Sequence, residues 1–85
     1  MHTKYVMYDN NEFVILPSHV QHVDFARPDV VSAGFLKFSA NTNSDGKSIP
    51  IVKCWGESQS LGIASRGDED AKIINVCLKI THQHG

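Results

Sequence analysis

Residues 55–70, WGESQSLGIASRGDED, bring together hydroxyl groups, glycines and an arginine directly ahead of an expected helix. The serine hydroxyls can donate hydrogen bonds, and Arg66 can form a bidentate contact with an oxyanion. The unpaired N–H groups and the dipole of a helix N-terminus also favour an anion. The candidate contacts for a phosphate, a nucleotide or a protein partner are Trp55, Ser58, Ser60, Ser65 and Arg66.

The same segment is also typical of a structural corner. It matches neither G-x-G-x-x-G nor G-x-x-x-x-G-K-[ST], the two glycine-rich phosphate motifs. Ser65 and Asp68 have the S-x-x-D spacing of a helix cap. The three acids at 68–70 suit the helix dipole but would repel an anion. We therefore expect Trp55 to anchor the segment to the core, followed by a short edge strand at Gln59–Ile63 and a capped helix start.

Nucleophilic catalysis requires a nucleophile, a base within reach and a group that orients the base. The segment GESQSLG is not a G-x-S-x-G elbow, because Ser60 stands where the second glycine would be. The candidate nucleophiles, by residue type alone, are Cys54, Ser58, Ser60, Ser65 and Cys77. Since a chain this short rarely builds a buried and preorganised site, we expect a protein that is not an enzyme.

Two pairs of histidines suggest metal binding as an alternative function. His19 and His22 are three residues apart and would share one face of a helix, whereas His82 and His84 follow much later. A zinc site usually needs three or four ligands, and the sequence contains neither C-x-x-C nor H-E-x-x-H. We therefore expect no metal and no cofactor, with His19 and His22 as the residues to test.

The chain of 85 residues has the length of one domain, residues 1–85, with a modest core. Its formal net charge is −1, and its lysines and arginines occur singly. This pattern argues against nucleic acid as a partner, because the basic footprint is missing. Nucleic-acid binding would be expected only if the fold gathered Lys37, Lys47 and Lys53 on one surface.

The sequence also argues against a membrane. No apolar run approaches the ~20 residues that span a bilayer, and the first residues lack the pattern of a signal peptide. Cys54 and Cys77 lie in apolar stretches, which is typical of buried thiols rather than of a disulfide. These features predict a cytoplasmic protein.

Hydrophobic alternation and turn residues predict six elements. Strands are expected at 3–8, 12–17, 29–40 and 48–56, and helices at 19–26 and from Asp68 onward. The alternation slips next to Gly34, which indicates a β-bulge there or a strand covered on both faces. Pro50 belongs at a strand start or at a sheet edge. The order β-β-α-β-β-α predicts an α+β fold, with an antiparallel sheet of about four strands and the C-terminal helix on one face.

The C-terminal helix has a wide apolar face. Its apolar residues cover roughly 200°, against the ~100° of a simple amphipathic helix. The face is formed by Ile73, Val76, Cys77 and Ile80, widened by Ile74 and Leu78, and the residues expected in water are Asp68, Lys72, Asn75 and Lys79. One small sheet would not cover such a face, so we expect a homodimer through this helix.

Two stretches, VVSAGFLKF and VKCWGESQSLGIASRGDEDAKII, resemble a pattern in small uncharacterised proteins encoded by bacteriophages and prophages, over residues 31–78. That pattern joins an Ala-Gly-Phe strand, an aromatic-Gly-x-Ser-x-Ser-Leu strand end and a Ser-Arg-Pro-acidic helix start. The chain departs from it at Gly67, where the pattern has proline. The resemblance implies a bacterial cytoplasmic setting and carries over no catalytic residue.

Taken with the apolar helix, the resemblance predicts a non-enzymatic accessory protein that binds a second copy of itself and a host or phage protein. The first alternative is an anion or nucleotide binder that uses the Ser/Arg segment before the helix. The second alternative is a metal-binding module built on the histidines.

Overall fold

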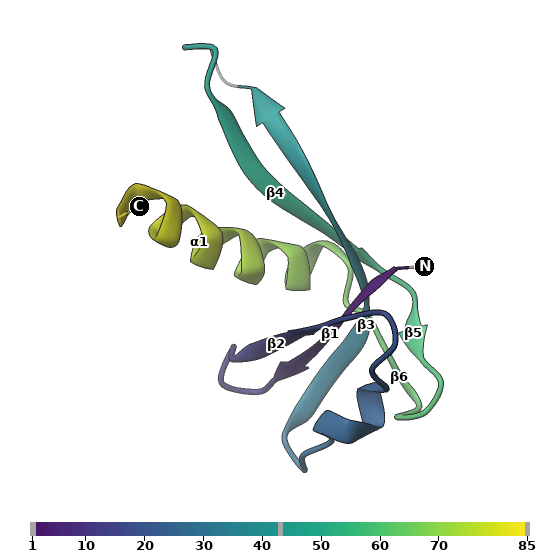
Figure 1. The fold of residues 1–85 in the computed structure, drawn as a ribbon. Coiled ribbons are helices and arrows are strands. Elements are labelled where there is room, and N and C mark those ends of the chain that lie inside the picture. The colour runs from purple at the N-terminus through teal and green to yellow at the C-terminus, as the bar shows by residue number, and fades with distance from the viewer. Residues whose placement is uncertain (1, 43, 85) are drawn as a thin grey trace.

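The computed structural model describes residues 2–42 and 44–84 of the chain, but not the side chains of residues 41, 49, 50 and 78–84. In chain order the elements are β1 (Thr3–Tyr8), β2 (Phe13–Leu16), the 3-10 helix η1 (His22–Phe25), β3 (Val30–Thr42), β4 (Ser48–Trp55), β5 (Glu57–Ser58), β6 (Ile63–Ala64) and α1 (Asp68–His84). Figure 1 shows α1 lying against a twisted sheet. This arrangement confirms the predicted α+β fold.

The main sheet has the strand order β2-β1-β3-β4, and all its neighbouring strands are antiparallel. The predicted first hairpin is confirmed, with β2 ending just before Pro17. Pro50 lies in β4, which is an edge strand as its missing N–H requires. Strands β5 and β6 form a separate two-stranded sheet.

The face of the main sheet that α1 covers carries one buried core. Because side chains alternate along a strand, Tyr5 and Met7 of β1 point to this face. The core consists of Tyr5, Met7, Leu36, Val52, Ala71 and Ile74, with Phe13, Cys54 and Ile73 packed at its border. The helix therefore attaches to the sheet through Ala71 and Ile74.

The opposite face carries a second core, formed by Val6, Tyr8, Leu16 and Ala33. Val20 and Leu61 help to cover it. The predicted helix at 19–26 is wrong, because only the single turn His22–Phe25 is helical. Gln21 at its start is extended and offers no side-chain cap, and Pro28 limits the segment on the other side.

The predicted bulge next to Gly34 is also wrong. Met7 pairs with Ser32 and Tyr8 with Val30, so the additional residue of the bulge is Val31. The other expectation for this strand, coverage on both faces, is confirmed by the complete burial of Ser32 and its neighbour Ala33.

Gly34 has a packing role. A Cβ atom there would lie 2.6 Å from the Trp55 carbonyl oxygen and 2.9 Å from Cβ of Ser65. A side chain at this position would therefore push the segment after β4 away from the sheet.

Strands β3 and β4 continue as a two-stranded arm that projects beyond the rest of the sheet (Figure 1). The ladder extends to the pair Thr42–Ser48. Phe38 on this arm is 55% exposed.

At Gly56 the backbone passes so close to the Phe35 ring that a side chain would not fit. Gly56 has φ +81°, and a Cβ atom there would lie 2.7 Å from Cδ2 of Phe35, whereas Gly62 has φ +67° with open space around it. We expect Gly62→Ala to lower the free energy of unfolding by about 1–2 kcal/mol through left-handed strain alone. Gly56→Ala should lower the free energy of unfolding by roughly 1–3 kcal/mol more than Gly62→Ala, because its new methyl group would overpack against Phe35. Urea denaturation measures both, and equal losses would contradict the close approach.

Candidate functional site

The segment at 55–70 folds as a corner between β4 and α1. Glu57 pairs with Ala64 and Ser58 with Ile63, and the Gly62 N–H donates to the Ser58 carbonyl at 2.8 Å. The predicted edge strand at Gln59–Ile63 is therefore wrong, because most of its residues form the turn between β5 and β6.

The serine hydroxyls of this corner are engaged within the chain. Ser58 is buried, and its Oγ accepts a hydrogen bond from the Leu61 N–H at 3.2 Å and lies 3.3 Å from Oγ of Ser60. Oγ of Ser65 accepts from the Gly67 N–H at 2.9 Å and is hydrogen-bonded to the Tyr5 hydroxyl at 2.6 Å. The Ser58 and Ser65 hydroxyls therefore stabilise the local backbone, whereas Ser60 is exposed.

Asp70 is the centre of the corner, and it is fully buried. Its carboxylate accepts hydrogen bonds from the Tyr5 hydroxyl, from the Arg66 N–H at 3.0 Å and from Nε of Arg66 at 2.8 Å. Burial alone would raise the pKa of Asp70, but these hydrogen bonds favour the charged form and hold the pKa below its ordinary value. Burial and the hydrogen bond to Asp70 raise the pKa of Tyr5.

Ser32 lies on the same side of the sheet as this carboxylate. Its hydroxyl also favours the charged form of Asp70, although Oγ makes no hydrogen bond of regular geometry to the described residues.

The predicted helix cap through Asp68 is not formed. Asp68 is exposed, and the reciprocal bonds at the helix start come from Ser65 and Asp70 instead. Sequence reasoning missed Asp70 and its partner Tyr5. The available signal was that a tyrosine buried in a strand usually needs a hydrogen-bond partner.

This arrangement weakens the case for an anion site at Arg66. Nε of Arg66 is 2.8 Å from a carboxylate oxygen of Asp70, and NH1 is 3.5 Å from Glu69. Its donors therefore already face two carboxylates, whose charge opposes a phosphate.

The Trp55 ring packs against other aromatic rings. It is half-buried beside Phe35 and His2, with ring centroids 6.2 Å and 5.0 Å away. It therefore joins a surface aromatic group and belongs to neither buried core. Close to these rings is a hollow of about 460 Å³, lined by Lys4, Gln21, His22, Phe35, Gly56, Glu57, Gln59 and Ser60.

The histidines do not assemble a metal site in the described part of the chain. His22 is buried and its Nε2 lies 2.8 Å from the Gly34 carbonyl oxygen, whereas His19 is exposed. Across residues 2–42 and 44–84, His, Cys, Asp and Glu form no group of three or more with metal-binding geometry. The side chains of His82 and His84 lie outside the described set.

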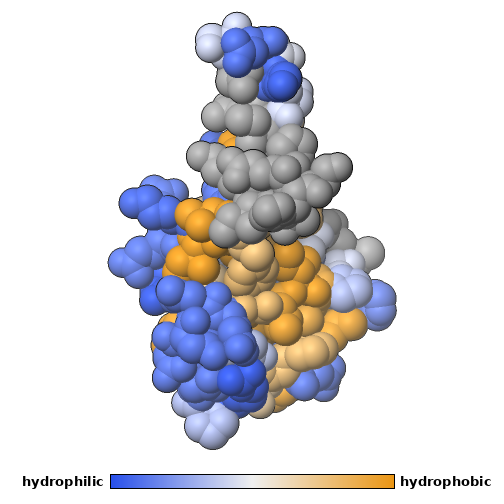
Figure 2. Space-filling view, turned by 90° about the vertical axis from the view of Figure 1, so that its left-hand side faces the viewer, coloured by the Kyte–Doolittle hydropathy of each residue, from blue (hydrophilic) through white to orange (hydrophobic). Residues whose placement is uncertain are grey.

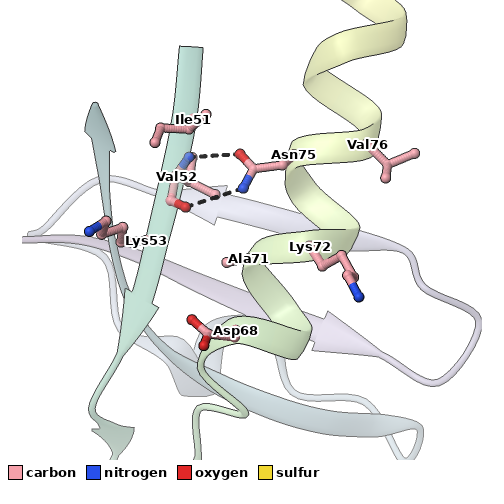
Figure 3. Close-up of a pocket in the computed structure, with 8 residues that line it drawn as sticks. All are labelled: Ile51, Val52, Lys53, Asp68, Ala71, Lys72, Asn75 and Val76. Atoms are coloured by element: carbon pink, nitrogen blue, oxygen red, sulfur yellow. Dashed lines mark hydrogen bonds between the residues drawn. The ribbon is translucent and has the colours of Figure 1, made fainter. Parts of the chain in front are cut away.

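A second hollow, of about 420 Å³, lies between β4 and α1 (Figure 3). Its lining residues are Ile51, Val52, Lys53, Asp68, Ala71, Lys72, Asn75 and Val76. Oδ1 of Asn75 accepts from the Val52 N–H at 2.7 Å, and Nδ2 donates to the Val52 carbonyl at 3.3 Å. Asn75 was expected in water, but it clamps the outer edge of β4 as a neighbouring strand would.

A third hollow, of about 470 Å³, separates α1 from the start of β2, and we call it the apolar groove. It is lined by Asn11, Phe13, Lys72, Ile73, Val76 and Cys77. Figure 2 shows that apolar residues form a broad surface on the side of the molecule from which α1 projects.

The groove changes the interpretation of the apolar helix face. The residues buried on the sheet are Ala71 and Ile74, whereas Val76 is 54% exposed and Cys77 is exposed. The expectation that Cys77 is buried is wrong for the single chain. The other expected members of the face, Leu78 and Ile80, lie outside the described side chains.

Cys54 is the more enclosed thiol, and neither cysteine is in a disulfide. Burial raises the pKa of Cys54 to about 11. Because the thiolate is the nucleophile, this thiol is weakly reactive at neutral pH.

Two lysines meet on the arm. Lys37 stands directly opposite Lys53 in the β3–β4 ladder, and both are exposed. Neither forms an ion pair with any described residue. Lys47 lies in the turn at the tip of the same arm.

Comparison of the chain with protein-family models, curated proteins and solved structures found no match. Among the described residues, no helix is both long enough and apolar enough to cross a membrane.

Replacing Asp70 should destabilise the fold in a pH-dependent way. We expect Asp70→Asn to lower the free energy of unfolding at pH 7 by roughly 2–3 kcal/mol, because a buried hydrogen bond to a charged group contributes about 1.5–3 kcal/mol. Since the folded-state pKa of Asp70 lies below the unfolded value of about 3.9, this contribution is present above that value and is lost as pH falls through the folded pKa.

Urea denaturation of both proteins from neutral to acidic pH measures this difference, which should shrink below about pH 4. Asp68→Asn is the matched control in the same helical turn, and it should cost less than about 1 kcal/mol. A pH-independent difference would contradict the role given to the Asp70 charge.

Proposed function

We propose that the protein is a non-enzymatic interaction module that forms a homodimer through the apolar groove beside α1. The observation that carries this proposal is the exposure of Val76 and Cys77 next to Phe13 and Ile73. Burying such a surface is favourable by about 25 cal/mol per Å² of apolar area removed from water.

A second copy of the chain is the occupant that the groove suits. In a dimer with a two-fold axis, each copy presents the same patch to the other. Lys72 is the charged residue that lines the groove, and the described lining contains no carboxylate. The apolar grooves of two copies can therefore pack against each other, and no oppositely charged surface on a different protein is needed.

The engagement of polar groups supports a non-enzymatic role. The Ser58 and Ser65 hydroxyls hold the corner together, and Cys54 has a raised pKa. The resemblance to phage and prophage proteins is the basis for proposing that the dimer acts in a bacterial cytoplasm on a host or phage protein.

Val76→Asp tests the dimer directly. We expect it to raise the dimer dissociation constant at least about tenfold, because a carboxylate would have to be buried against an apolar surface. Analytical ultracentrifugation over a range of concentrations measures this constant. Val23→Asp is the matched control, because Val23 is 49% exposed and lies outside the groove. A monomeric wild-type chain, or equal effects of the two variants, would contradict the proposal.

A second candidate function, nucleic-acid binding, is favoured by the pairing of Lys37 with Lys53 on the projecting arm. Like charges directly opposite each other in a sheet are destabilising, and a polyanion would offset that cost. A two-stranded ribbon also fits the major groove of DNA. The overall charge of −1 still argues against it.

The arm can be tested with a short DNA duplex at low salt. We expect Lys37→Gln/Lys53→Gln to weaken binding and to reduce the salt dependence of the logarithm of the affinity by about two, one for each phosphate contact. Lys37→Arg/Lys53→Arg keeps the charge and should retain binding. Fluorescence anisotropy that detects no binding by the wild type would eliminate this candidate.

A further inference from the structure

The two edges of the main sheet differ in their capacity to accept another strand. At β4, both backbone groups of Val52 are occupied by Asn75. Pro50 is two residues away and so turns the same side of its backbone outward, but it has no N–H to donate. The β4 edge is therefore closed at successive outward-facing positions.

The β2 edge has the opposite character. The Tyr8 N–H donates to the Glu12 carbonyl, so by alternation Val14 and Leu16 are the β2 residues whose backbone faces β1. Phe13 and Ile15 turn their N–H and carbonyl groups outward, where the described chain places no further strand. The sequence FVIL contains none of the charges or prolines that usually protect an edge.

We infer that β2 pairs with β2 of a second copy, antiparallel and with Phe13 opposite Ile15, to give one continuous eight-stranded sheet. This inference rests on the proposed homodimer and specifies how it forms. A two-fold axis at Val14 places Phe13 of each copy opposite Ile15 of the other, so the same strand can serve as both partners. Two hydrogen-bonded residue pairs, and so four backbone hydrogen bonds, result.

Neighbouring registers are poorer. Centring the pair on Ile15 would place Phe13 opposite Pro17, which has no N–H. Centring it on Phe13 would place Ile15 opposite Asn11, whose φ of +65° interrupts the strand. The register centred on Val14 is the one that uses both outward-facing residues.

The same register continues the apolar groove. Phe13 lies opposite Met7 and Ile15 opposite Tyr5, so both side chains are on the face that α1 covers. Pairing two copies places Ile15 of the second copy beside Phe13, at the floor of the groove. Edge pairing and apolar burial therefore occur on one continuous surface.

Single cysteines distinguish the registers. In a Cys77→Ser background, Val14→Cys should form an interchain disulfide in most chains on mild oxidation, because non-hydrogen-bonded antiparallel neighbours have Cα atoms about 4.5 Å apart, within disulfide range. Ile15→Cys is the control, because the two Ile15 residues would be about 8 Å apart, beyond the ~7 Å limit. Non-reducing electrophoresis and mass spectrometry measure the product.

Cross-linking of Ile15→Cys, or failure of Val14→Cys to cross-link while ultracentrifugation shows a dimer, would overturn the register and leave the homodimer intact. A monomeric wild-type chain would overturn both proposals. Hydrogen exchange on the unmodified protein is an independent readout. The Phe13 and Ile15 amides should be protected at concentrations that favour the dimer and exchange rapidly on dilution. Rapid exchange within the dimer would overturn the inference.

Discussion

The buried carboxylate of Asp70 is the interaction on which the arrangement of the molecule depends. It connects Tyr5 in the first strand to Arg66 in the corner and to the first turn of α1. Once Asp70 points inward, the 3.6-residue period turns Ile74 onto the core and Asn75 toward β4. The position of Val76 in water is a consequence of the same rotation.

The sequence predicted the class and most strand positions, because alternation and turn residues report local geometry. It did not predict how α1 is rotated on the sheet. Apolar residues surround more than half of that helix, and the two residues that fix its rotation, Asp70 and Asn75, are polar. Hydropathy assigns such residues to solvent, whereas their real positions depend on partners in β1 and β4 that are distant along the chain.

The contacts of the candidate site were likewise not predictable from local sequence patterns. Ser58, Ser65 and Arg66 have side chains that could bind a ligand, and residue type alone cannot say whether their donors are already occupied. The structure brings Ser65 and Arg66 together around Asp70 but leaves Trp55 with Phe35 and His2. The uncovered apolar groove was anticipated only as a helix face, because its other wall, Phe13, comes from the first hairpin.

In the proposed dimer, the Asn75 clamp on Val52 would also limit the size of the assembly. A sheet with two open edges can add copies at both ends, and such addition continues into a fibre. A sheet with one edge occupied by its own side chain can be extended at the other edge only. If the proposed dimer forms, addition of one copy would use the open β2 edge of both molecules, and growth would stop at two. The amide of Asn75, together with Pro50 in β4, would thus separate a finite complex from a polymer.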